Sequence, residues 1–139
     1  MMQAKVKWTG GLQFVGESGS NHAVVLDADS SHGGTNMGMT PMELLLVGIG
    51  GCSGMDVASI LQKKRQLVND LEVRVSGTQA EEYPRKFTAI ELEYIISGKD
   101  VKEEAVKKAI ESSMEKYCSV KATLEGVAKI TYRYSIINV

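Results

Sequence analysis

The sequence predicts an α+β fold in which antiparallel sheets and helices occupy separate stretches of one domain, residues 1–139. Two observations lead to this prediction. Apolar and polar residues alternate in short segments bounded by glycine-containing turns, which is typical of strands joined in hairpins. Two longer segments space their apolar residues as helices do, and each begins with a capping pattern. The predicted order is three strands, a long helix, two strands, a helix pair and a strand.

Length and composition indicate an ordinary globular protein. Hydrophobic residues make up 43% and charged residues 24% of the 139 residues, which is enough apolar material for a core. The net charge of −1 excludes a broad attraction to nucleic acid or to anionic membranes. We find no apolar run of membrane-spanning length and no signal-peptide pattern, so we expect a cytoplasmic protein with reduced cysteines.

The first part of the chain predicts a three-stranded antiparallel meander and then a long polar loop. We expect the strands at residues 5–8, 12–17 and 22–28, with turns rich in glycine, serine and asparagine between them. The loop, residues 27–39, contains three glycines and is long enough to be functional. A flexible surface connection fits the same residues.

Residues 40–65 predict one long helix with a cysteine near its middle. Thr40 and Glu43 form a capping box, and Pro41 occupies the first helical position, where its missing N–H costs nothing. Basic residues fill the last turn, where positive charge suits the helix dipole. The apolar positions are too many for one narrow stripe, so we expect most of this helix to be buried.

Four glycines surround Cys52 in this helix: Gly48, Gly50, Gly51 and Gly54. Each glycine in a helix interior costs about 1 kcal/mol relative to alanine. Their concentration therefore indicates that another backbone or a ligand comes close to the helix at this point. A close helix–helix crossing and a ligand approach are compatible interpretations.

After the long helix, the sequence predicts a β-hairpin and then helices. Apolar residues alternate with polar ones at residues 71–76 and 90–96, and a polar turn lies between them. Asp100 is expected to begin the next helix, with Glu103 as its capping partner.

The last part of the chain predicts a short helix and a closing strand. Ser119 is expected to cap a helix at residues 120–125, which Gly126 ends. The strand is expected at residues 127–136, and it completes an antiparallel sheet.

The two cysteines are the main candidates for chemistry. A zinc site made of Cys52, Cys118, His22 and His32 would require four scattered positions to converge, so we expect no metal and no cofactor. A reactive thiol pair fits the cysteines better than such a site. Two buried, inert cysteines are the alternative, because free cysteine is among the most buried residue types.

The surroundings of the two thiols differ. Cys118 lies just before the expected start of a helix, whose N–H groups stabilise a thiolate, and Lys116 adds positive charge nearby. Cys52 lies in mid-helix, gains little from the dipole and needs a cation from elsewhere. Asp56 shares a helix face with Cys52. Its carboxylate would raise the pKa of the thiol unless it holds an intervening cation or caps a neighbouring group.

Two motifs that lie far apart in the chain resemble a known family. The first is TPMELL followed by GGCSGMDV around Cys52, and the second is EKYCSV around Cys118. In these motifs, in length and in the order of its elements, the chain is similar to the OsmC/Ohr family, and most closely to its YhfA-like branch. The resemblance implies an OsmC-like fold with a long central helix that carries the first cysteine. It also implies an intertwined homodimer with its sites at the subunit interface.

The same resemblance implies a thiol peroxidase that takes part in oxidative-stress defence. Cys52 would attack an organic hydroperoxide and become a sulfenic acid, and Cys118 would then form a disulfide with it. An external dithiol would reduce that disulfide. This assignment agrees with the chemistry of thiols, because the thiolate is the nucleophile and a sulfenic acid condenses readily with a nearby thiol.

The chain departs from the family pattern in the loop before the helix. Peroxidase members place an arginine there against the thiolate, and a glutamate directly after the helix-initiating proline orients it. Here residues 27–39 contain no arginine, and Met42 follows the proline. The residues that we expect to support the thiols instead are Glu43, Asp56, His32 and Lys116. The second hypothesis is therefore an OsmC-like protein that senses redox state or binds a small molecule.

Overall fold

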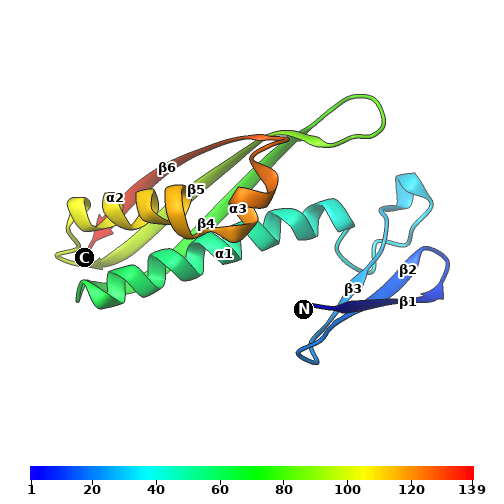
Figure 1. Cartoon of the computed structure of the whole chain (residues 1–139), viewed down its shortest axis with the longest axis horizontal. Coiled ribbons are helices and arrows are strands. Elements are labelled where there is room, and N and C mark those ends of the chain that lie inside the picture. Colours follow the sequence, from blue (N-terminus) through cyan, green and yellow to red (C-terminus); the bar gives the residue numbers. More distant parts are fainter. The chain divides into compact units, whose positions relative to one another are not determined.

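The computed structural model describes residues 1–139, which divide into two units at residue 45. The first unit, Met1–Leu45, contains a three-stranded sheet and a loop. The second unit, Leu46–Val139, contains another three-stranded sheet and most of the helical residues (Figure 1). The large buried apolar residues all belong to this second unit.

The first unit confirms the predicted antiparallel meander. Its strands are β1 (Ala4–Gly10), β2 (Gln13–Ser18) and β3 (Ala23–Leu26), and they lie in the order β1-β2-β3. Gly10 and Gly11 both have positive φ angles at the first turn, which glycine adopts without strain. No residue of the three strands is buried.

The loop that follows β3 is folded around one carboxylate. Asp27 is only 3% exposed and accepts hydrogen bonds from the Ala28 N–H at 2.7 Å, the Met37 N–H at 3.1 Å and the Thr35 hydroxyl at 2.7 Å. The hydrogen bond from the Thr35 hydroxyl, with help from the N–H groups, holds the pKa of this carboxyl below its usual value. This network gives the loop a defined structure.

The long helix α1 (Pro41–Lys63) begins with the predicted capping box. The Thr40 N–H donates to Glu43 Oε1 at 2.9 Å, and the Glu43 N–H donates to Thr40 Oγ1 at 3.2 Å. The prediction that most of this helix is buried is wrong. Only five of its residues are buried, namely Ile49, Gly50, Ser53, Val57 and Leu61. One stripe packs against the second sheet, Ser53 and Asp56 form hydrogen bonds with Ser113, and the remaining surface is partly or fully exposed in the single chain.

The expectation that no stretch reaches membrane-spanning length also needs correction. By length and composition alone, α1 is apolar enough to cross a membrane. The core helix of a soluble protein passes the same test, and α1 uses its buried stripe to cover a sheet of its own chain.

The second sheet has the order β4-β5-β6. The predicted hairpin is present and longer than expected, with β4 (Leu67–Gln79) antiparallel to β5 (Phe87–Lys99). The final strand β6 (Lys129–Asn138) lies parallel to β5, so the expectation of purely antiparallel sheets is wrong here. A helical connection joins β5 to β6 and returns the chain to the end of the sheet where β5 began, which makes the two strands parallel.

The helices of this connection begin differently from their predicted caps. The first is α2 (Glu103–Ser112), and Asp100 does not cap it but adopts a positive φ of 52° before it. The N–H groups of Val101 and Lys102 are bound instead by the side chains of Asn138 and Gln66. These partners come from β6 and from the turn between α1 and β4, so local sequence did not reveal them.

One π-helical turn, Ser113–Tyr117, extends α2, and the short helix α3 (Ser119–Leu124) follows. Cys118 is the N-cap of α3, not Ser119 as predicted, because its Sγ accepts the Lys121 N–H at 3.4 Å. The cysteine that the sequence placed near a helix start is therefore part of the cap itself.

The core lies between one face of the second sheet and the helices α1 and α2 (Figure 1). Every second residue of the middle strand β5 is buried, as its alternating pattern predicts: Ile90, Leu92, Tyr94 and Ile96. Val57 of α1 and Val106 of α2 are both 0% exposed. This packing fixes both cysteine-bearing segments within one unit.

Candidate functional site

The structure brings the two cysteines of the second unit together. Cys52 projects from α1, and Cys118 lies at the junction of the π-helical turn and α3. Both are free thiols. Their Sγ atoms and a carboxylate oxygen of Asp56 all lie within 4.8 Å of one another. Asp56 follows Cys52 by one helical turn, so α1 presents both side chains to Cys118.

Cys118 is the more buried of the two thiols. It is 4% exposed, whereas Cys52 is partly exposed. Burial raises the pKa of the Cys118 thiol to about 11, and its hydrogen bond with Cys52 and the negative charge of Asp56 act in the same direction. The Lys121 N–H opposes this change. The expectation that the helix start would favour the Cys118 thiolate is therefore wrong, because burial outweighs the helix terminus.

A chain of hydroxyl groups leads from the core to Asp56. Ser113 Oγ donates to Asp56 Oδ2 at 2.9 Å and lies 2.7 Å from Ser53 Oγ, which lies 2.5 Å from the Tyr94 hydroxyl. Ser53, Ser113 and Tyr94 are all 0% exposed. Burial raises the pKa of Tyr94 to about 12, so its phenol is protonated at neutral pH.

The direction of this chain follows from counting protons. Each hydroxyl carries one hydrogen, and the hydrogen of Ser113 goes to the carboxylate. Ser113 must then accept from Ser53, and Ser53 must accept from Tyr94. All three donors therefore point toward Asp56, and the last of them, the Ser113 hydroxyl, orients the carboxylate.

The other residues expected to support the thiols have local partners. The Glu43 carboxylate binds the Thr40 N–H in the capping box. His32 Nδ1 lies 2.7 Å from Asp29 Oδ1 within the loop of the first unit. Lys116 is exposed, and its ammonium group lies 5.1 Å from the centre of the Tyr117 ring. Asp56 is thus the one of these four residues that the structure places beside both thiols within a single unit.

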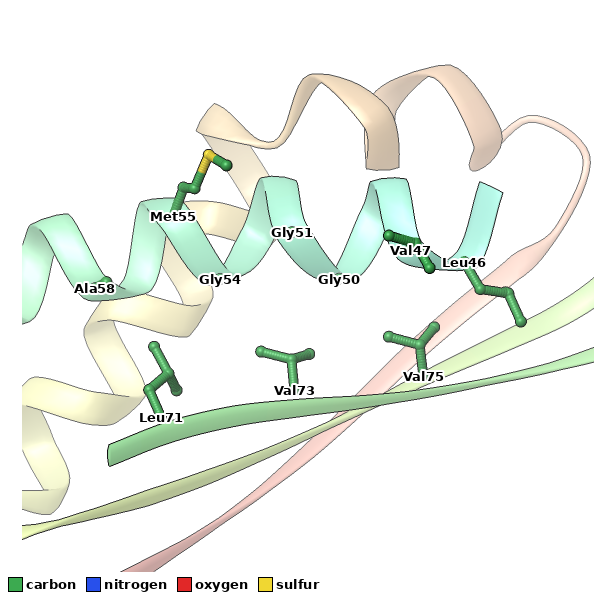
Figure 2. A pocket seen from close by; sticks show the side chains of 10 residues that line it. All are labelled: Leu46, Val47, Gly50, Gly51, Gly54, Met55, Ala58, Leu71, Val73 and Val75. Atoms are coloured by element: carbon green, nitrogen blue, oxygen red, sulfur yellow. The ribbon is translucent and has the colours of Figure 1, made fainter. Parts of the chain in front are cut away.

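A groove of about 710 Å³ runs between α1 and the edge strand β4. Figure 2 shows Leu71, Val73 and Val75 of β4 directed toward α1, with Val47 and Met55 on the helix side. Its lining is almost entirely apolar.

The glycines of α1 around Cys52 are of two kinds. A Cβ at Gly50 would come within 2.9 Å of a Val75 methyl group, so a larger residue there would force Val75 or the helix to shift. A Cβ at Gly48 or Gly51 would meet no atom within 4 Å. The close approach near Cys52 is therefore to a strand and not to another helix of this unit. The open glycines leave space for a ligand or a second chain.

The sequence analysis missed the hydroxyl chain. Ser53 and Ser113 each occupy a buried position on an otherwise apolar helix stripe, and Tyr94 is an inward residue of a core strand. Polar residues at such positions require partners, which is a usable signal. Their convergence could not be read from the sequence, because they come from three separate segments.

A carboxyl group beside two thiols can serve two kinds of chemistry. Neighbouring thiols can pass through a sulfenic acid to a disulfide. Two sulfurs and a carboxylate oxygen are also donor types that bind zinc. In this small α+β protein, two neighbouring thiols lie beside a long glycine-rich helix. This arrangement is that of a protein with redox chemistry at its thiols.

Comparison with known proteins identifies the family. The model of the family described as OsmC-like protein matches residues 33–133, and the chain belongs to this family. It is 47% identical to Protein YhfA of Escherichia coli K12 over 136 residues, which cover 98% of each chain.

Solved structures agree with this assignment. A hypothetical protein from Aquifex aeolicus is 33% identical with a TM-score of 0.81, covering 98% of this chain and 97% of that one. An organic hydroperoxide resistance protein from Elizabethkingia anophelis has the same fold, with a TM-score of 0.72 at 18% identity. That likeness covers 100% of this chain and 96% of the other.

Proposed function

We propose that this protein is a thiol peroxidase that reduces organic hydroperoxides and contributes to oxidative-stress defence. The observation that carries the proposal is the proximity of the two thiols, whose Sγ atoms lie within 4.8 Å of each other. Family membership supports it, since structures of the same fold include organic hydroperoxide resistance proteins.

The proposed cycle assigns different roles to the two thiols. The partly exposed Cys52 attacks the terminal peroxide oxygen as a thiolate, the O–O bond breaks, and the alcohol leaves with a proton. The Cys118 sulfur then displaces the hydroxyl of the Cys52 sulfenic acid, which forms a disulfide and releases water. An external dithiol supplies two electrons and restores both thiols. The raised pKa of Cys118 supports its role as the second sulfur to react.

Single-turnover oxidation tests this cycle. We expect one equivalent of cumene hydroperoxide to remove both thiols of the reduced, metal-free protein and to lower its mass by two hydrogen atoms. Cys118→Ser should stop at a Cys52 sulfenic acid, which dimedone traps. Cys52→Ser, the matched control, should consume no peroxide. Peroxide consumption by Cys52→Ser at the wild-type rate would show that the assignment is wrong.

The same experiment examines a second function. Asp56, a carboxylate, lies beside the thiols, and residues 27–39 supply no arginine. These observations favour a redox-sensing or small-molecule-binding protein with little peroxidase activity, because a carboxylate disfavours a neighbouring thiolate. If the wild-type thiols stay unchanged over minutes in cumene hydroperoxide, the result supports this second function and contradicts the peroxidase proposal.

We also propose that two copies of the chain form a homodimer. The α1 face along the groove exposes apolar side chains in the single chain, with Val47 54% exposed and Met55 75% exposed. Large exposed apolar patches mark association sites. We expect Val47→Glu to convert a dimer into a folded monomer in sedimentation measurements. Leu67→Glu, at a position 62% exposed outside the groove, is the control and should leave the dimer intact.

The proposed compartment is the cytoplasm, where two free cysteines stay reduced. The proposed cycle needs no cofactor and no nucleic acid or membrane partner. Its partners are the second copy, the hydroperoxide and the external dithiol.

A further inference from the structure

The cluster of Cys52, Asp56 and Cys118 has the composition of a metal site. Each residue directs one donor atom toward the others, and these atoms all lie within 4.8 Å of one another. Zinc bonds of about 2.3 Å to sulfur and about 2.0–2.2 Å to oxygen place the donors of a tetrahedral site roughly 3.5–3.8 Å apart. The three donors must therefore approach one another by at most about 1.3 Å to reach that spacing.

Charge at the cluster also suits a cation. Asp56 forms no salt bridge, and its hydrogen-bond donor is the neutral hydroxyl of Ser113. The two lysines that flank Cys118 in sequence are engaged elsewhere, since Lys121 pairs with Glu125 and Lys116 lies over the Tyr117 ring. A carboxylate beside two thiols opposes thiolate formation unless a positive charge lies between them.

The groups around the cluster already orient its donors. The hydroxyl chain from Tyr94 through Ser53 and Ser113 fixes Asp56 Oδ2 and leaves Oδ1 for another partner. The Lys121 N–H points at Cys118 Sγ. Such second-layer hydrogen bonds are what hold metal-binding carboxylates and thiolates in place.

We propose that the reduced protein binds one thiophilic divalent cation, of which Zn²⁺ is the representative, through Cys52 Sγ, Cys118 Sγ and a carboxylate oxygen of Asp56. Two thiolates select a soft or borderline cation, and three protein donors leave the fourth tetrahedral position for water or another ligand. Binding replaces the two thiol protons, which pass to solvent. The cation and peroxide then compete for the same sulfurs, so the bound metal protects the thiols from oxidation.

Spectroscopic titration with Co²⁺ and competition for Zn²⁺ with a chromophoric chelator test the site without any peroxide. The reduced protein should take up one Co²⁺ and show thiolate-to-cobalt charge transfer with tetrahedral d–d bands. Cys52→Ser and Cys118→Ser should each weaken the charge-transfer band. Asp56→Asn should lower Zn²⁺ affinity about 10-fold or more, while Asp70→Asn, at an exposed site on β4, should not.

Three results would overturn the site. They are the absence of a thiolate-to-cobalt band in the wild type, equal Zn²⁺ affinity in Asp56→Asn and wild type, and equal loss of affinity in Asp70→Asn. Circular dichroism verifies that each variant is folded. Should Asp56→Asn fail to fold, Ser113→Ala replaces it, with an expected loss of about 10-fold through the misoriented carboxylate.

The link to oxidation is measured separately. One equivalent of Zn²⁺ should block loss of thiols to cumene hydroperoxide in the wild type, and a chelator should restore it. If the metal-free protein does not react with peroxide but the reduced protein binds Zn²⁺, the peroxidase proposal is wrong and the metal-site proposal is supported. A protein that is oxidised at the same rate with and without saturating Zn²⁺ would refute the competition.

Discussion

The two three-stranded sheets of this chain differ in how their apolar surfaces are covered. In the second sheet, inward residues of β5 such as Leu92 and Tyr94 are 0% exposed beneath helices of the same unit. In the first sheet, Val6 and Trp8 remain 60% and 62% exposed. A sheet gains stability mainly by burying one face. The second sheet therefore has its own core, whereas the first sheet buries no residue of its strands within its own unit.

The largest expected effect comes from opening the core of the second unit. Leu92→Ala removes a fully buried side chain and should lower the free energy of unfolding by about 2–5 kcal/mol. Val6→Ala in the first sheet is the matched control and should change it by about 0.5 kcal/mol or less. Urea titrations of both variants measure the difference. Similar losses in the two variants would contradict the contrast between the sheets.

A smaller change in the free energy of unfolding should appear at high pH. It comes from the Cys118 thiol, which belongs to the second unit. The pKa of Cys118 is raised from 9.0 to about 11 in the folded protein, so folding favours its neutral form. This contribution is fully present below pH 9.0 and is lost as pH rises through about 11. We expect wild type to lose on the order of 2 kcal/mol relative to Cys118→Ser over this range.

Urea titrations of both proteins at several pH values give that difference, and titrating groups that do not interact with Cys118 cancel in the comparison. A stability difference that stays constant between pH 9.0 and about 11 would show that burial does not raise the pKa of the Cys118 thiol.

The smallest expected effect is confined to the first unit. Asp27→Ala removes the acceptor of the loop hydrogen bonds, so residues 27–39 should exchange their amide hydrogens faster while β5 stays protected. The pKa of Asp27 is lowered in the folded state. Its contribution is therefore present above the ordinary value of 3.8 and is lost as pH falls below it.

Hydrogen exchange measured by mass spectrometry follows both regions in one experiment. Wild-type loop amides should keep their protection at pH 5 and lose it under stronger acid. Protection that is equal in Asp27→Ala and wild type would mean that this carboxylate does not organise the loop.

Local patterns in the sequence determined most of the elements. Alternation gave the meander and the β4–β5 hairpin, and the capping box of Thr40 and Glu43 gave the start of α1. Each of these signals acts between residues close in sequence, so it can be read without the fold. The two family motifs likewise singled out both cysteines and led to the OsmC-like family.

Only the tertiary structure decided which residues surround the cysteines. Burial between α1 and α3 raised the pKa of Cys118 against the influence of its helix terminus, and three distant hydroxyls aligned on Asp56. The parallel direction of β6 and the hydrogen bonds from the N–H groups before α2 to Gln66 and Asn138 also arise from contacts across the fold. Desolvation and hydrogen-bond geometry depend on positions in space, and a linear sequence does not state them.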